Sequence, residues 1–271
     1  MRHHQTLSIF PSLCALSLAL AGCAQATQEN TGTSTANATV RESATVCFAG
    51  RSLGDDPYAS GGNSDLANLC TSLPHLIRDV DGWDADYPFF RWNADLDHAL
   101  DVIVSALDTD GDGSVTSNDE DRDLNVIGYS WGGFDARDVI AAMQWDDRFS
   151  DDRRGVARFF ALDPYQTVLL AFPRRAMQVP ANVQTLYEFR HTVAPDDDCS
   201  RVVPYLVGPF TGREPECTGD TVCNDYDYSA ADATAGVDHC GVPAAATHAI
   251  QEIVSGREPD DLPPVSTYET Y

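Results

Sequence analysis

The chain has 271 residues, of which 42 are acidic and 17 are Lys or Arg, giving a formal net charge of −25 at pH 7. So negative a chain repels nucleic-acid phosphates and anionic lipid headgroups, which argues against both as binding partners. The same excess favours solubility outside the cell and supplies carboxylates suited to Ca²⁺. Nothing in the composition indicates the oligomeric state.

Residues 1–22 have the pattern of an export signal. A short basic start precedes an apolar run, residues 7–20, that is too short to span a bilayer comfortably. The run ends in Leu-Ala-Gly-Cys, which resembles a bacterial lipobox and implies cleavage before Cys23 and lipidation of its sulfur. Attachment to the membrane would then be through acyl chains alone. The same resemblance implies the outer membrane, with a periplasmic or cell-surface domain, because Ala24 follows the cysteine where an aspartate would signal retention in the inner membrane. The alternative is an ordinary secretory signal cut nearby.

Residues 23–43 begin with Cys23 and are mostly Thr, Ala, Asn, Gln and Ser without an apolar period, so we interpret them as a flexible tether. Residues 44–271 have the length of a single α/β domain. Six cysteines of this domain in an exported chain indicate three disulfides, and their spacing does not match a zinc site. The sequence leaves the pairing open; the expected pairs are, in order, Cys217–Cys223, Cys47–Cys70 and Cys199–Cys240.

The first half of the domain alternates strands and helices. We expect strands over residues 45–49 and 87–92, and amphipathic helices over residues 64–80, where Pro74 interrupts the period, and 94–107. This alternation is typical of a parallel sheet.

Residues 108–119 follow the second expected helix directly. Counted from Asp108, carboxylates fall at positions one, three, five and twelve, and glycine at position six, a pattern that resembles the calcium loop of EF-hands and, with Asp at twelve, of dockerins. A strand follows in place of a second helix, and the loop occurs once where dockerins have two. The resemblance implies a structural Ca²⁺ and no organic cofactor; a solvated acidic loop is the alternative. The implied ligands are the side chains of Asp108, Asp110, Asp112 and Asp119, the carbonyl of Ser114, and Thr116 directly or through water.

An expected strand, residues 124–129, leads through Gly128-Tyr129-Ser130-Trp131-Gly132 into an expected helix over residues 134–143. This Gly-x-Ser-x-Gly pattern between strand and helix resembles the nucleophile elbow of the α/β-hydrolase superfamily. The resemblance implies a compact α/β-hydrolase fold, mostly a parallel sheet with helices on both faces, and Ser130 as the nucleophile. It also implies an oxyanion hole made by the N–H groups of Trp131 and of Arg51, which follows the first strand.

Two further expected strands, residues 156–162 and 183–190, are each followed by carboxylates. Hydrolases of this fold carry the acid of the catalytic triad at one or other of these positions. The form Leu-Asp-Pro resembles the lipase branch and favours Asp163. The aspartates at residues 196–198 remain the alternative.

His239 precedes the last expected helix, residues 243–256, and would complete the order Ser, Asp, His of the fold. His191, at the end of a strand, is an alternative base. Three other histidines are expected on helices, two before the nucleophile and one within the last helix: His75, His98 and His248.

These residues predict an exported serine hydrolase that cleaves small or lipid-like carboxylic esters through an acyl-enzyme on Ser130. A thioesterase, an amidase and a lipase would carry the same pattern. The alternative is a non-catalytic, calcium-stabilised surface lipoprotein that uses the scaffold for binding. Only the enzyme requires Ser130 and His239 to lie within hydrogen-bond reach.

Overall fold

The computed structural model describes residues 42–52, 56, 58, 61–79, 87–164, 176–191, 215–228, 237, 239–257 and 259. All of them belong to the unit Thr39–Tyr271. The expected export signal, the expected lipidation site Cys23 and almost all of the expected tether lie outside the described residues. Within the described part, no helix combines the length and the apolar character needed to cross a bilayer.

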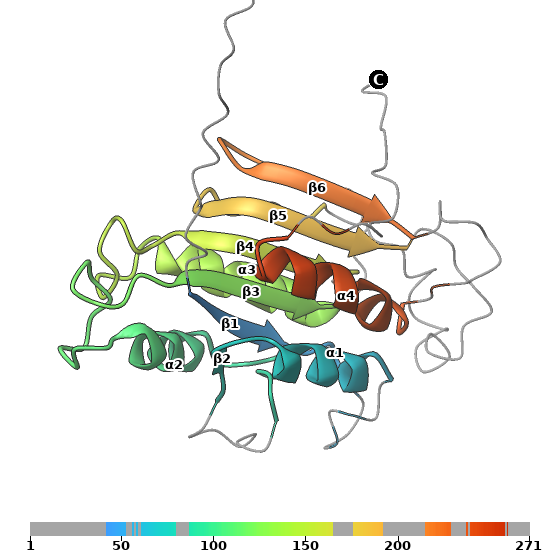
Figure 1. The fold of residues 1–271 in the computed structure, drawn as a ribbon, viewed down its shortest axis with the longest axis horizontal. Coiled ribbons are helices and arrows are strands. Elements are labelled where there is room, and N and C mark those ends of the chain that lie inside the picture. Colours follow the sequence, from blue (N-terminus) through green and yellow to red (C-terminus); the bar gives the residue numbers. More distant parts are fainter. Residues whose placement is uncertain are drawn as a thin grey trace, which may run out of the picture. The chain divides into compact units, whose positions relative to one another are not determined.

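In the described part of the chain, six parallel strands form one sheet in the order β2-β1-β3-β4-β5-β6 (Figure 1). The chain runs from β1 outward to β2 and then back past β1 to β3, so the direction of winding reverses between β1 and β3. In open parallel sheets, ligands bind at the carboxyl ends of the strands beside such a point. The strands are β1 (Ser43–Phe48), β2 (Leu76–Ile77), β3 (Asp123–Tyr129), β4 (Val156–Leu162), β5 (Val183–Arg190) and β6 (Val222–Asp227).

Helices cover both faces of this sheet (Figure 1). Apolar residues of α2 and α3 join one core cluster, and those of α1 and α4 join a second cluster on the other face. Since both faces are covered, the central strands are apolar almost throughout. The expected α/β class is confirmed. The helices are α1 (Gly61–Ser72), α2 (Leu96–Leu107), α3 (Trp131–Met143) and α4 (Val242–Val254).

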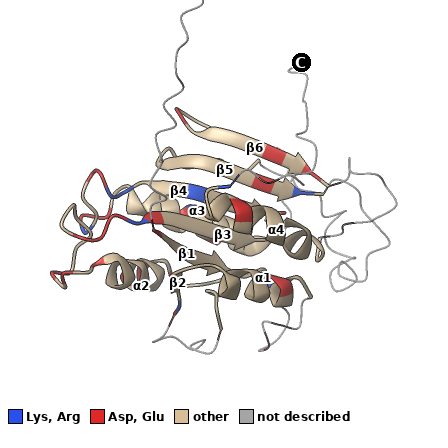
Figure 2. Cartoon of the chain, viewed as in Figure 1, with Lys and Arg blue, Asp and Glu red and all other residues tan. Residues whose placement is uncertain are grey.

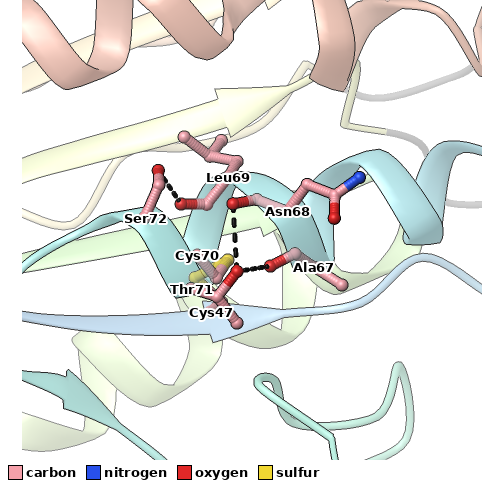
Figure 3. Close-up of a disulfide and its surroundings, with 7 residues drawn as sticks. All are labelled: Cys47, Ala67, Asn68, Leu69, Cys70, Thr71 and Ser72. Carbon is pink, nitrogen blue, oxygen red and sulfur yellow. Dashed lines mark hydrogen bonds between the residues drawn. A yellow bond between two sulfur atoms is a disulfide. The ribbon is translucent and has the colours of Figure 1, made fainter.

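The expected helix over residues 64–80 is wrong in its second half. The helix ends at Ser72, whose hydroxyl donates to the Leu69 carbonyl at 2.6 Å (Figure 3). His75 then takes a φ of 47°, a left-handed conformation that turns the chain into β2, so this histidine lies in a turn and not on a helix. The apolar residues after Pro74 continue the helical spacing by coincidence, because they pack from a turn and a short strand.

Two other expectations about strands also fail. The strand expected over residues 87–92 is reduced to a single bridge between Phe90 and Phe48. In contrast, β6 forms where no element was expected. Its first half is largely exposed and its sequence is Val-Cys-Asn-Asp-Tyr-Asp, so it lacks the apolar run that marks a central strand.

Two of the expected disulfides are confirmed. Cys47–Cys70 joins β1 to α1 in the buried core (Figure 3), and Cys217–Cys223 closes the turn that leads into β6. Cys240 is also disulfide-bonded, while its expected partner Cys199 lies outside the described residues. A disulfide of this kind stabilises a fold by about 3 kcal/mol, mainly by restricting the unfolded chain.

Candidate active site

Ser130 lies on a sharp turn between β3 and α3, with φ 54° and ψ −122°. This conformation is costly for any residue except glycine, so the surrounding structure must hold it in place. The turn is possible because its neighbours have no side chains: a Cβ on Gly128 would lie 2.6 Å from Gly133 Cα, and one on Gly132 would lie 2.4 Å from the Ala49 carbonyl oxygen. The spacing Gly-x-Ser-x-Gly is therefore a steric requirement of this turn.

Serine at the start of a helix usually caps it, but the Ser130 hydroxyl makes no capping bond to α3. Instead, Ser130 Oγ lies 2.9 Å from His239 Nε2. On the other side of the imidazole, His239 Nδ1 lies 2.5 Å from Asp163 Oδ2. The structure thus brings together the three residues expected as a triad, from the loops after β3 and β4 and the turn before α4. Their catalytic roles stay a prediction, and the alternative acids at residues 196–198 lie outside the described residues.

Asp163 has a second histidine partner. His191 Nδ1 lies 2.6 Å from the same Oδ2 atom, and the His191 backbone N–H donates to Oδ1 at 3.4 Å. Burial alone would raise the pKa of Asp163, but the hydrogen bonds and charges of the two imidazoles outweigh it and hold the pKa below its usual value. The carboxylate therefore stays ionised although only 1% of the residue is exposed.

The sequence pattern indicated His191 as an alternative base and did not predict its contact with the Asp163 carboxylate. The signal was its position, directly after the strand that neighbours the strand of Asp163. The Asp163 N–H donates to the Phe189 carbonyl at 2.6 Å, which places the two strand ends side by side.

One carboxylate and two imidazoles are also a donor set for zinc or a related metal. Metal–ligand bonds of about 2.0–2.1 Å in a tetrahedral site separate neighbouring donor atoms by roughly 3.3 Å. The separations from Asp163 Oδ2 to the two Nδ1 atoms are 2.5 and 2.6 Å, which fit hydrogen bonds and leave no room for an ion between them.

Tyr129 positions the imidazole of His239. The two rings stack with centroids 5.1 Å apart, and the Tyr129 hydroxyl donates to the His239 carbonyl at 3.2 Å. Space for this hydroxyl exists because residue 62 is glycine; a Cβ there would lie 2.3 Å from it. The residue before the expected nucleophile thus helps to hold the expected base, which the sequence pattern did not reveal.

The loop after β1 lies against the serine. A Cβ on Gly50 would approach Ser130 Cβ to 3.0 Å. The buried Asn63 side chain fixes this loop, accepting from the Gly50 N–H and donating to the Gly50 carbonyl, both at 2.9 Å. Because the Gly50 N–H is occupied, the next N–H along the chain, that of Arg51, remains the candidate oxyanion donor with that of Trp131 at the start of α3.

The acidic loop at residues 108–119 lies before β3, and Figure 2 shows acidic residues gathered there. Carboxylate oxygens of Asp108, Asp110 and Asp112 lie within 4.8 Å of one another. Gly113, at position six, has φ 87°, and its N–H donates to Asp108 Oδ2 at 2.8 Å. Three hard oxygen donors at this separation fit one divalent cation such as Ca²⁺.

The remaining expected ligands take part in hydrogen bonds within the loop. Asp119 is not one of the three carboxylates that lie within 4.8 Å of one another, but it borders them: it accepts from the N–H group of Asp110 at 3.3 Å and from those of Thr109 and Thr116 at 2.6 and 2.7 Å. The Thr116 hydroxyl accepts from the Asn118 N–H at 3.1 Å, and the Ser114 N–H donates to Asp112 at 2.8 Å.

No family model matches the chain, and a search of curated proteins finds no match either. Function is therefore inferred from the sites themselves.

Proposed function

We propose that the protein is a serine hydrolase that cleaves carboxylic esters through an acyl-enzyme on Ser130. The observation that supports this most directly is the continuous contact from Ser130 Oγ through the His239 imidazole to the buried Asp163 carboxylate, at 2.9 and 2.5 Å. A serine on a strained turn whose hydroxyl meets an imidazole, and not the helix it starts, is arranged as an activated nucleophile.

The reaction follows from these contacts. His239 Nε2 takes the proton of Ser130 as Oγ attacks the carbonyl carbon, and the same proton then passes to the departing alcohol. Asp163 holds the Nδ1–H tautomer and stabilises the imidazolium. The N–H groups of Trp131 and Arg51 would hold the oxyanion, each lowering the barrier by about 3 kcal/mol. Water, deprotonated by His239, cleaves the acyl-enzyme and restores the serine.

The sequence adds the setting of this activity. Cys23 in its lipobox-like context supports an exported lipoprotein of the outer membrane, and the resemblance to lipases supports a small or lipid-like ester as substrate. Both depend on the sequence pattern alone.

Calcium is the second component of the proposal. Asp108, Asp110 and Asp112 would hold one Ca²⁺, which would neutralise a cluster of like charges. Asp110 accepts a hydrogen bond from the Asp112 N–H, yet desolvation and the neighbouring carboxylates raise its pKa above the usual value. A cation relieves that repulsion and stabilises the loop between α2 and β3, so its role is structural.

The test uses a fluorophosphonate probe on the full-length protein purified in detergent. We expect labelling of the wild type and of Ser255→Ala, a change at the far end of α4, and none of Ser130→Ala. If the folded, calcium-supplemented wild type is not labelled and hydrolyses no short-chain ester, the proposal is wrong. The non-catalytic binding scaffold then becomes the better interpretation.

A further inference from the structure

Arg51 is held by two tryptophans. Its guanidinium carbon lies 5.1 Å from the ring centroid of Trp92 and 4.8 Å from that of Trp131. The two indoles stand nearly perpendicular, at 89°, with centroids 5.4 Å apart. The guanidinium therefore sits in a corner between two aromatic rings, an arrangement favoured by cation–π attraction.

This cluster of Arg51, Trp92 and Trp131 lies beside the nucleophile. Trp131 directly follows Ser130, and Gly50, which precedes Arg51, packs against the Ser130 side chain. Arg51 itself is exposed, so its charged group meets solvent or substrate next to the reacting serine.

The charge of Arg51 has no acidic partner within the part of the chain that the structure describes. This contrasts with other arginines there: Arg148 pairs with Asp146, Arg153 with Asp121 and Arg190 with Asp225. In a protein with a net charge of −25, a cation that lies next to the expected nucleophile and has no acidic partner among the described residues stands out. Contact with the indoles restricts the guanidinium, while its N–H edges keep the fork geometry that binds a carboxylate through two hydrogen bonds.

We propose that Arg51, positioned by Trp92 and Trp131, binds a carboxylate carried by the ester substrate. This inference rests on the proposed hydrolase function and gives it a substrate class: esters with a second, anionic end. The negative surface elsewhere disfavours anions, so Arg51 would supply the local attraction that such a substrate needs.

The experiment compares two esters on the full-length protein. Both are 4-nitrophenyl esters of adipic acid, one with a free distal carboxylate and one with that carboxylate methylated. The readout is the ratio of kcat/KM for the anionic ester to that for the neutral ester, which cancels any general change in catalysis. We expect the wild type to favour the anionic ester, and Arg51→Met to lower the ratio by about 10- to 100-fold, as for a lost hydrogen bond to a charged group.

Arg257→Met is the matched control. It removes the same charge, its side chain is 64% exposed, and it lies just past the end of α4, a 13-residue helix that begins after His239. That length places it about 20 Å from the base. We expect the control to keep the ratio. Trp92→Leu removes one of the two rings and should lower the ratio partly, and added salt should lower it in the wild type.

An unchanged ratio in Arg51→Met, with both esters hydrolysed, overturns the carboxylate site and leaves the hydrolase proposal standing. A wild type that hydrolyses neither ester and resists the fluorophosphonate probe overturns both.

Discussion

The aspartates at the two ends of the sheet differ in burial, in hydrogen-bond partners and in the direction of their pKa shift. At the carboxyl end, Asp163 is buried and two imidazoles meet its carboxylate. At the amino end, about 23 Å away along the seven residues of β3, Asp108, Asp110 and Asp112 are clustered and exposed or half-exposed to solvent. The pKa of Asp163 is lowered, whereas that of Asp110 is raised.

The difference shows what each end needs from outside the protein. The charge of Asp163 is stabilised by contacts with groups of the chain itself, so this end is organised before any ligand arrives, as the proposed catalysis requires. The charges at the amino end repel one another, so under the calcium proposal a cation would complete this end. The two ends should therefore respond independently to mutation and to calcium.

The largest expected effect is on activity and comes from Asp163→Asn. The amide cannot hold the Nδ1–H tautomer of His239, and we expect kcat for a 4-nitrophenyl ester to fall about 10⁴-fold. Asp151→Asn, at an acid whose side chain is 93% exposed, is the control and should keep full activity. If Asp163→Asn retains more than a tenth of the rate, Asp163 is not the acid of a triad. Calcium-dependent stability should not change in either variant.

The second largest effect should come from calcium at the amino end. At a Ca²⁺ concentration 100 times Kd, binding to the folded state alone stabilises it by about 2.7 kcal/mol. We expect calcium to raise Tm in the wild type and a chelator to reverse the rise. Asp110→Asn should weaken this response, and esterase activity of the variant should persist at temperatures where it is folded. A Tm that is indifferent to calcium would make residues 108–119 a solvated acidic loop.

The expected positions of the triad could be read from the sequence because steric and topological rules are strict there. Only glycine fits at residues 128 and 132, and parallel strands bring their carboxyl ends to one edge. Contacts that depend on how neighbouring strands and loops align could not be predicted from the sequence. Tyr129 against His239 and His191 against Asp163 join residues far apart in the chain, and a single sequence does not give those distances.

The sequence predicted the strands that are strongly buried and did not predict those at the edges of the sheet. β3 and β4 are buried almost throughout and form apolar runs. The edge strands β2 and β6 are, respectively, two residues long and partly exposed, so neither produces a periodic apolar signal. The end of α1 was missed for a related reason: the apolar spacing continues past the turn at His75.

A smaller effect on activity should come from the second histidine at the carboxyl end. His191→Leu removes the imidazole that contacts the Asp163 carboxylate beside His239. The carboxylate charge then acts on the His239 imidazole alone. We expect kcat/KM to fall about tenfold, the low end of the loss found when outer-shell partners of metal ligands are removed, and the acidic limb of the pH–rate profile to move to higher pH. His191→Asn keeps a donor and should restore part of both. If the limb stays in place in both variants, His191 only fills space.

The smallest expected effect concerns Asp135, an acid at the same end of the sheet for which the described structure shows no imidazole partner. Asp135, on α3 five residues after Ser130, has one buried carboxylate oxygen without a hydrogen-bond partner in the described structure. Burial and then the charge of Asp138 raise its pKa to about 7. Because this value lies above that of the unfolded chain, Asp135 favours the folded state below about pH 4, and this contribution is lost as the pH rises from about 4 through 7.

Asp135→Asn should therefore stabilise the protein at pH 8, where the wild type must ionise a poorly solvated carboxyl, and should have little effect at pH 4. A shift of about 3 pKa units corresponds to roughly 4 kcal/mol; since Asp135 is partly exposed, solvent screening reduces the expected gain to about 1 kcal/mol. Urea unfolding of wild type and variant at both pH values measures it. If the free energy of unfolding differs between variant and wild type by the same amount at both pH values, the Asp135 carboxyl is already well solvated. Asp163 would then be the desolvated acid at this end of the sheet.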